Sequence, residues 1–214
     1  MAQSENKVMA VINAVGEAIL MNLAFLVCCI PVITIGQAWC GLYTAIGYRT
    51  RGEKWQTGFK KGFCSHFLRG TIAWMILLLP IGYMAFRTYA VWFYRTENPN
   101  FIVELIINGI GLLMAIGLQT NLVLANVYLP GDTMQWLENG IKMTFTAPLH
   151  TLCPLTVTWL PVVLGLFFPN LLFLTLLVFV AVFFALGALV TTVVYLPKLK
   201  KLSAQIQTNQ EDSV

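Results

Sequence analysis

The sequence has few charged residues. Asp, Glu, Lys and Arg make up 10% of the 214 residues, while hydrophobic residues make up 58%. A soluble domain carries about 25% charged residues, so this scarcity excludes an ordinary soluble domain. The net charge of +4 comes from basic residues that lie between apolar runs rather than on one face. Such spacing is typical of a membrane topology signal and argues against nucleic-acid binding.

The sequence also lacks the motifs of common catalytic and metal sites. No nucleophile has a placed base, no carboxylate pair lies in an apolar run, and no Gly-rich phosphate loop is present. His66 and His150 have no third ligand at a suitable spacing. We therefore expect a protein that is not an enzyme and that holds no metal or cofactor. The five cysteines form no CxxC pair and are expected to be reduced thiols among apolar neighbours: Cys28, Cys29, Cys40, Cys64 and Cys153.

Long apolar runs are the dominant feature that is present. Residues 171–196 include about 26 positions without a charge, and a helix of about 20 apolar residues crosses a bilayer. The same reading along the chain predicts an all-α membrane protein with about five transmembrane helices and short amphipathic interfacial helices. It forms a single polytopic domain over residues 1–214. The predicted spans are 17–48, 70–94, 101–129, 149–168 and 171–196, followed by a cytoplasmic tail at 197–214.

The first predicted span is too long for one straight crossing. It contains Pro31 and Gly36, and a proline inside a helix kinks or breaks it. We expect one span that kinks at Pro31. The alternative is a hairpin at Pro31–Gly36, which gives six crossings, although each half would have only about 14 residues.

Basic residues predict the orientation of the spans. Ten of the 13 Lys and Arg residues fall on one side if five spans alternate, in the 49–69 loop, at Lys142 and after residue 196. The positive-inside rule makes this the cytoplasmic side, which puts the N-terminus outside and the C-terminus in the cytoplasm. The hairpin alternative would put the N-terminus inside as well.

Two loop segments resemble each other. Residues 55–63 and 136–145 share a Trp followed by Gly-x-Lys-x-x-Phe, at an offset of 81 to 82 residues. A proline-containing apolar run follows each copy. This pattern predicts a parallel internal repeat of span, amphipathic helix and span. The alternative is a chance likeness, since any helix beside a membrane needs an aromatic anchor and a lysine.

The first loop segment carries an aromatic stripe at helical spacing, formed by Trp55, Phe59 and Phe63. Three interpretations stay open: a helix in the cytoplasmic headgroup region, packing on the underside of the bundle, or docking of a partner protein. The residues predicted to contact a partner or the membrane surface are Trp55, Phe59, Lys60, Phe63, Trp136, Lys142 and Phe145.

The third span carries a polar stripe on one helix face. Its members recur every three or four residues and should face the protein interior, because polar side chains are costly in hydrocarbon. Asn108, Gln119 and Asn126 are the candidate ligand-binding residues. The alternative is that small and polar residues simply hold helices together. We also expect Glu17 and Glu104 to pair with Arg87 or Arg95.

The N-terminal apolar run carries a family resemblance. Asn22-Leu23 is followed by Pro31-Val32-Ile33-Thr34-Ile35-Gly36, and Arg51-Gly52-Glu53 comes later. This pattern resembles the YesL-like bacterial membrane proteins, although Trp39 and Cys40 stand where small residues are expected. The likeness covers most of the chain in layout, but its motif covers only about the first 70 residues.

The resemblance implies a multi-pass protein of the bacterial cytoplasmic membrane, and an accessory role in carbohydrate uptake beside the subunits of an ABC transporter. It supplies no binding or catalytic residues. The alternative function is a small stand-alone transporter with a polar site on the third span. The lipid bilayer is the expected surrounding, and a homo-oligomer stays open.

Overall fold

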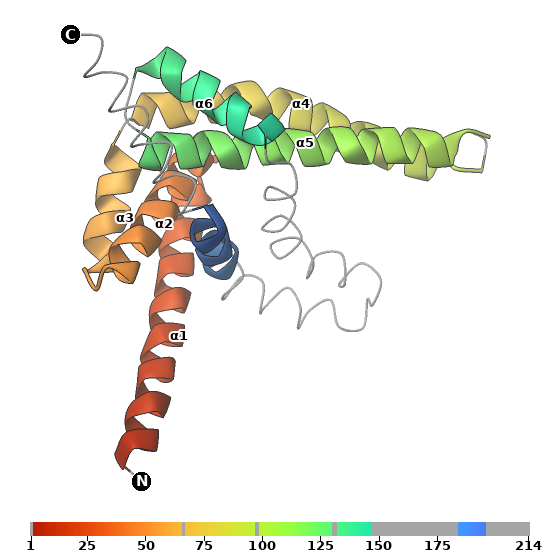
Figure 1. The fold of residues 1–214 in the computed structure, drawn as a ribbon. Coiled ribbons are helices and arrows are strands. Elements are labelled where there is room, and N and C mark those ends of the chain that lie inside the picture. The colour runs from red at the N-terminus through yellow and green to blue at the C-terminus, as the bar shows by residue number, and fades with distance from the viewer. Residues whose placement is uncertain (1, 66, 97–98, 130–131, 147–183, 196–214) are drawn as a thin grey trace.

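The computed structural model describes residues 2–65, 67–96, 99–129, 132–146 and 184–195, and these are helical with no strand among them (Figure 1). The predicted all-α class is therefore confirmed for the described residues. The labelled elements are α1 (Ala2–Cys29), η1 (Val32–Thr34), α2 (Ile35–Thr50), α3 (Trp55–Cys64), α4 (Phe67–Phe93), α5 (Phe101–Tyr128) and α6 (Thr133–Thr146). A further apolar helix covers Phe184–Tyr195.

Among the described residues, three helices are long and apolar enough to cross a membrane: α1 over Ile12–Cys29, α4 and α5. At most 17% of the residues in each of these windows are buried inside the protein. Apolar surface of this extent is not left open to water in soluble proteins, so it is consistent with a membrane protein. The prediction of about five spans is not confirmed, because 149–168, most of 171–196 and the tail 197–214 lie outside the described residues.

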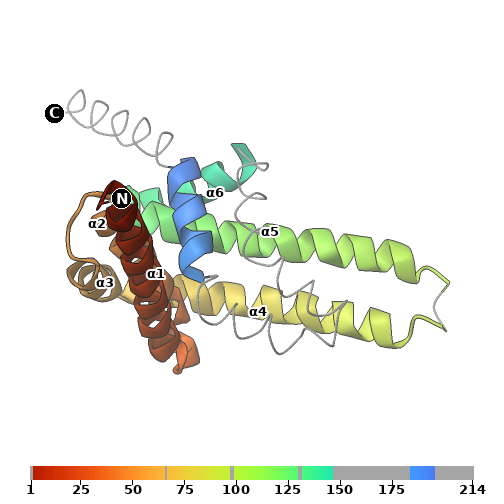
Figure 2. The ribbon, with the colours of Figure 1, turned by 90° about the horizontal axis from the view of Figure 1, so that it is seen from below.

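Helices α4 and α5 form a long antiparallel hairpin (Figures 1 and 2). At its far end Arg87 of α4 pairs with Glu104 of α5 at 3.4 Å, which confirms that part of the predicted pairing. Arg95 lies 4.9 Å from the centre of the Trp92 ring. Six aromatic side chains in this part of the hairpin are all exposed: Tyr83, Phe86, Tyr89, Trp92, Phe93 and Tyr94.

The segment 17–48 is a hairpin rather than one kinked span. The helix ends at Cys29, and α2 runs back along α1, so that Arg49 pairs with Glu17. The expected pairing of Glu17 with Arg87 or Arg95 is therefore wrong. Proline lacks the N–H that would continue the helical hydrogen bonding, and its ring clashes with the preceding turn. Helix α4 continues through Pro80, so the proline permits the break at Pro31, and the contacts of Thr34, Trp74 and Arg49 make it complete.

Side chains add hydrogen bonds to the backbone carbonyls around this turn, two of which, those of Pro31 and Val32, also accept backbone N–H groups. The hydroxyl of Thr34 donates to the carbonyl of Cys28 at 2.6 Å and to that of Pro31 at 2.8 Å. The indole Nε1 of Trp74, on α4, donates to the carbonyl of Val32 at 2.8 Å. An unsatisfied carbonyl costs several kcal/mol in lipid, so these bonds stabilise the turn in an apolar surrounding.

The main core lies where α1, α2 and the helix Phe184–Tyr195 meet. The side-chain oxygen of Asn22, which is fully buried, accepts a hydrogen bond from the backbone N–H of Ala185 at 3.1 Å. The ring of Phe184 lies 5.1 Å from that of Phe25 and 5.8 Å from that of Trp39. Figures 1 and 2 show α1 crosswise to the α4–α5 hairpin, so these three helices do not form a parallel bundle.

Helices α2 and α4 touch at two glycines. A Cβ on Gly36 would lie 2.5 Å from the carbonyl oxygen of Gly70, and a Cβ on Gly70 would lie 2.7 Å from Nε2 of Gln37. That amide nitrogen donates to the carbonyl of Phe67 at the start of α4. Only glycine permits this backbone approach.

We predict that Gly36→Ala lowers the free energy of unfolding by about 1–3 kcal/mol, because the added methyl group overpacks the α2–α4 contact. The control is Gly109→Ala, where a Cβ meets nothing within 4 Å. Thermal melting of the two variants in detergent measures the difference. Equal melting temperatures would contradict the close contact.

Candidate functional site

Four helices meet in a narrow space that is lined by side chains of α2, α4, α5 and α6. We call it the amide seam, because two side-chain amides are its main polar groups. The space is too narrow for a water molecule. Its lining residues are Cys40, Gly70, Ala73, Gln119, Leu122, Val123, Asn126 and Trp136.

Gln119 is the unusual residue of the seam. Its side chain is 6% exposed, and neither its amide nitrogen nor its amide oxygen has a hydrogen-bond partner among the residues that the structure describes. Asn126 donates to the sulfur of Cys40 at 3.4 Å, while its own side-chain oxygen has no partner. A buried polar group without a partner costs about 1–3 kcal/mol, and most native proteins have few.

Neighbouring polar groups are bonded, which sets Gln119 apart. The indole Nε1 of Trp136 donates to the carbonyl of Leu122 at 2.7 Å. The amide of Asn121 donates to the hydroxyl of Thr144 at 3.0 Å. These two bonds hold α6 against α5 and fix the indole where it lines the seam.

The structure brings two of the three candidate ligand-binding residues together. Gln119 and Asn126 both line the seam, as their spacing of two helical turns on α5 requires. Asn108 is buried on the same stripe, but its amide donates to the carbonyl of Glu104 at 2.8 Å. It precedes Gln119 by 11 residues, which is about 16 Å along the helix. Asn108 is therefore not part of this site.

The aromatic stripe of α3 packs against α2. Trp55 and Phe59 are buried and Phe63 is half-buried. A Cβ on Gly41 of α2 would lie 3.3 Å from the Phe59 ring. Of the three interpretations, packing on the protein's own helices fits this arrangement. Trp55 and Phe59 are therefore not open to the surface contact that the sequence predicted, whereas Lys60 is exposed.

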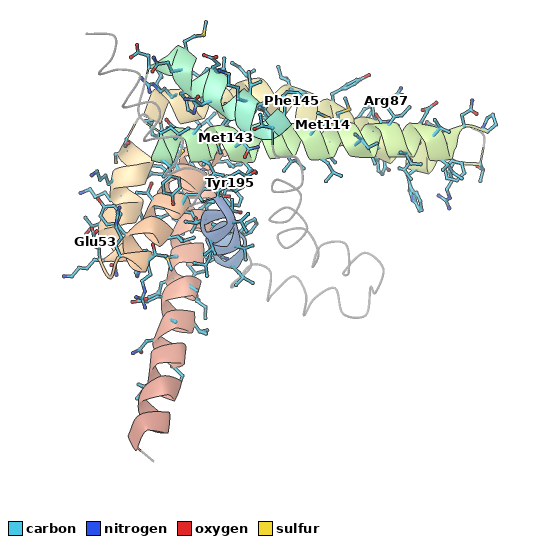
Figure 3. All side chains as sticks on the ribbon, in the orientation of Figure 1. Glu53, Arg87, Met114, Met143, Phe145 and Tyr195 are labelled. Atoms are coloured by element: carbon cyan, nitrogen blue, oxygen red, sulfur yellow. The ribbon has the colours of Figure 1, made fainter. Side chains whose placement is uncertain are left out.

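Helix α6 has one buried face and one exposed face. Trp136 and Gly140 face α5, where a Cβ on Gly140 would lie 2.5 Å from a methyl group of Leu122. Trp136 is therefore also closed to surface contact, whereas Lys142 and Phe145 are exposed. In Figure 3 Phe145 lies near the end of α6 and Arg87 lies well along α4 toward the far end of the hairpin.

The exposed face of α6 is apolar, and of its members only Phe145 was predicted from the sequence as a surface contact. Four of its side chains, 39–75% exposed, recur at intervals of three, four and four residues, so they form one stripe. We call them the outer stripe: Met134, Leu137, Ile141 and Phe145. The prediction followed the likeness of α6 to α3 and so included Trp136. The helical spacing of the four apolar residues would have predicted the outer stripe. The outer face of α3 differs because it is basic and polar, with Lys54, Lys60 and Lys61 exposed.

No protein-family model, curated protein or solved structure matches this chain. Within the described residues, no three His, Cys, Asp or Glu side chains come together in a group that could hold a metal ion. The site is therefore described by its amides, its indole and the apolar helices around them.

We predict that Trp136→Phe lowers the free energy of unfolding by about 1 kcal/mol, because it removes the hydrogen bond to the carbonyl of Leu122. Trp92→Phe is the matched control, since Trp92 is exposed on α4 and its indole contributes less to packing. Thermal melting in detergent compares them. A Trp136→Phe melt that equals that of Trp92→Phe would contradict the role of this bond.

Proposed function

We propose that the protein is an accessory membrane subunit of carbohydrate uptake, which docks on a transporter subunit through α3 and α6. The carbohydrate part of the proposal comes from the resemblance of residues 22–36 to the YesL-like proteins. The docking part is supported by the outer stripe of α6. Both helices lie toward the end of the molecule opposite the 94–100 connection (Figure 1).

The outer stripe is the observation that carries the docking proposal. Helix α6 buries Trp136, Gly140 and Met143 on one face and still exposes four apolar side chains on another. Lys142 and Glu138 of α6 pair with each other at 2.6 Å. Their charges offset each other, so no net charge from this pair lies beside the outer stripe. An amphipathic face with anchors at this spacing fits a groove on a partner.

The exposed lysines at α3 favour a partner with an acidic surface. Lys54, Lys60 and Lys61 are exposed, and none of them forms an ion pair with a described residue. Exposed basic groups attract an acidic surface and orient its approach. The preferred partner therefore has an apolar groove beside acidic residues on the side of the membrane that faces α3.

The Glu17–Arg49 pair supports a topology that differs from the one the sequence favoured. It joins the middle of α1 to the end of α2, beside the basic 49–69 loop. The N-terminus would then lie on the cytoplasmic side together with that loop. Arg87 and Arg95 would be the only basic residues of the sequence outside, which strengthens the positive-inside bias.

The internal repeat gains support from two equivalent contacts. Gly41 of α2 meets the Phe59 ring of α3, and Leu122 of α5 meets Gly140 of α6. Both pairs are related by an offset of 81 residues, which is that of Trp55 and Trp136, whereas the Gly-x-Lys-x-x-Phe part aligns Gly140 with Gly58 at an offset of 82. Each contact joins a glycine to a large side chain. The glycine belongs to α2 in the first copy and to α6 in the second. We propose that the two helix pairs descend from one unit.

A stand-alone transporter remains the second candidate, with Gln119 and Asn126 in its path. Among the described residues, the amide of Gln119 and the side-chain oxygen of Asn126 have no hydrogen-bond partner, which favours it. The seam is too narrow for a water molecule, however, and it would have to widen for any solute to pass. We prefer the accessory role because the outer stripe of α6 is exposed without any such rearrangement.

We predict that affinity purification from native membranes in mild detergent recovers subunits of a carbohydrate transporter. The double variant Ile141→Ser/Phe145→Ser should reduce this recovery at least tenfold, because it removes the centre of the outer stripe. Phe93→Ser is the control, since Phe93 is exposed at the far end of α4. Recovery of the wild-type protein alone, or an equal loss in the control, would contradict docking through α6.

We predict that an epitope at the N-terminus is reached by antibody only after the membrane is permeabilised. An epitope inserted in the 94–100 connection should be reached in intact spheroplasts, because it lies on the side with the fewest basic residues. As a control, Western blots compare the expression levels of the two epitope-tagged proteins. Antibody access to the N-terminal epitope in intact spheroplasts would contradict the proposed topology.

A further inference from the structure

We infer that the amide seam is a binding site for a neutral ligand that carries hydroxyl groups on a compact ring, and that sugars are the class it takes. The seam is closed in this structure and opens to admit the ligand. This inference deepens the proposed function, and it rests on that proposal for the choice of sugars over other polyols.

The hydrogen-bonding capacity left in the seam matches a hydroxyl group. Gln119 offers one N–H₂ donor and one oxygen acceptor without partners, and Asn126 offers a second acceptor. A hydroxyl donates one hydrogen bond and accepts others, so adjacent hydroxyls on a ring satisfy donors and acceptors together. Asn126 also has only the weak acceptor sulfur of Cys40, which a ligand oxygen would replace with a stronger bond.

The absence of charge in the lining decides the ligand's charge. None of the eight described residues that line the seam carries a charge at neutral pH, since the Cys40 thiol is buried and accepts the bond from Asn126. A phosphate or carboxylate would be buried here without a counter-charge, which is strongly unfavourable. A neutral ligand avoids this cost.

Trp136 supplies the apolar part of the site. Its indole lines the seam, and its Nε1 is already bonded to the carbonyl of Leu122, so the ring is held in place. The C–H face of a sugar ring packs on such an indole while its hydroxyls reach the amides at the edge. Indoles combine an apolar body with a fixed orientation, which suits a ligand with one apolar face.

Small residues form the wall that faces the amides. Gly70 and Ala73 of α4 present almost no side chain to the seam. In the closed form the Gln119 amide gains no bond from a described residue, and the Asn126 amide gains only its bond to the Cys40 sulfur. A ligand that enters between α4 and α5 would satisfy those amides, and this supplies the free energy that opens the seam.

The stability of Gln119→Leu without ligand separates a binding role from a structural one. Leucine has a similar size and no polar atoms, so the variant should melt several degrees above wild type when Gln119 is unpaired in the closed seam. Asn121→Leu should melt lower, because Asn121 donates to Thr144. Gln56→Leu, on the exposed face of α3, should not change. A Gln119→Leu protein that melts below wild type would overturn the inference.

Ligand binding is measured on the purified full chain in detergent by thermal stabilisation and by quenching of tryptophan fluorescence. The probes are D-glucose, D-galactose, D-xylose and maltose, with glycerol as a polyol and glucose 6-phosphate as a charged sugar. At least one neutral sugar should raise the melting temperature of wild type by a few degrees, as binding to the folded state does. Gln119→Leu should abolish this shift, and Gln56→Leu should keep it.

Three results would overturn the sugar site: no shift with any neutral sugar, a shift with glycerol alone, or an equal shift in Gln119→Leu. A shift with glucose 6-phosphate that exceeds the shift with glucose would overturn the requirement for a neutral ligand. These measurements use the isolated protein, so their outcome is independent of whether a transporter complex is recovered from membranes. If affinity purification recovers no transporter subunits but a neutral sugar still raises the melting temperature, only the accessory role is refuted.

Discussion

The structure depends on how an apolar chain completes its backbone hydrogen bonds where its first helix breaks. Pro31 ends α1 within a run of hydrophobic residues, and a membrane offers no water to the carbonyls that are released. Thr34 bonds to the released carbonyl of Cys28, and Trp74 adds a bond to the carbonyl of Val32. Because Trp74 belongs to α4, the bond that completes the turn also places α4 against it. The close contact of Gly36 with Gly70 follows from the same placement.

The same requirement explains the rest of the polar interior. Asn22 bonds to Ala185, Asn121 to Thr144 and Trp136 to Leu122, and each bond joins two helices that lie apart in sequence. Gln119 departs from this rule although it is as buried as its neighbours. Proteins tend to retain such departures where they serve a function rather than stability. This contrast, rather than any single motif, directs attention to the amide seam.

The sequence predicted what depends on local pattern. The apolar lengths of α1, α4 and α5 and the inward position of Asn108 and Gln119 follow from composition and from the 3.6-residue period. The sequence could not decide between a kink and a hairpin at Pro31, because proline disrupts the helix in both. The outcome depends on Thr34, Trp74 and the distant pairing of Glu17 with Arg49. Asn108 shares a helix face with Gln119 but lies about 16 Å from it along the helix. The sequence shows the shared face, but it does not show that the two residues belong to different sites.

The hairpin at Pro31 is the central claim, because α2, the basic loop and the placement of α4 all follow from it. The most direct test measures the distance between spin labels at Val15 on α1 and Thr50 at the end of α2 by double electron–electron resonance, in a chain whose native cysteines are replaced. The two positions are 35 residues apart, so a continuous helix would separate them by about 52 Å. The hairpin predicts a narrow distribution below about 25 Å, because helices in contact lie about 8–10 Å apart and the label linkers add to that distance. A distribution centred near the length of a continuous helix would contradict the account.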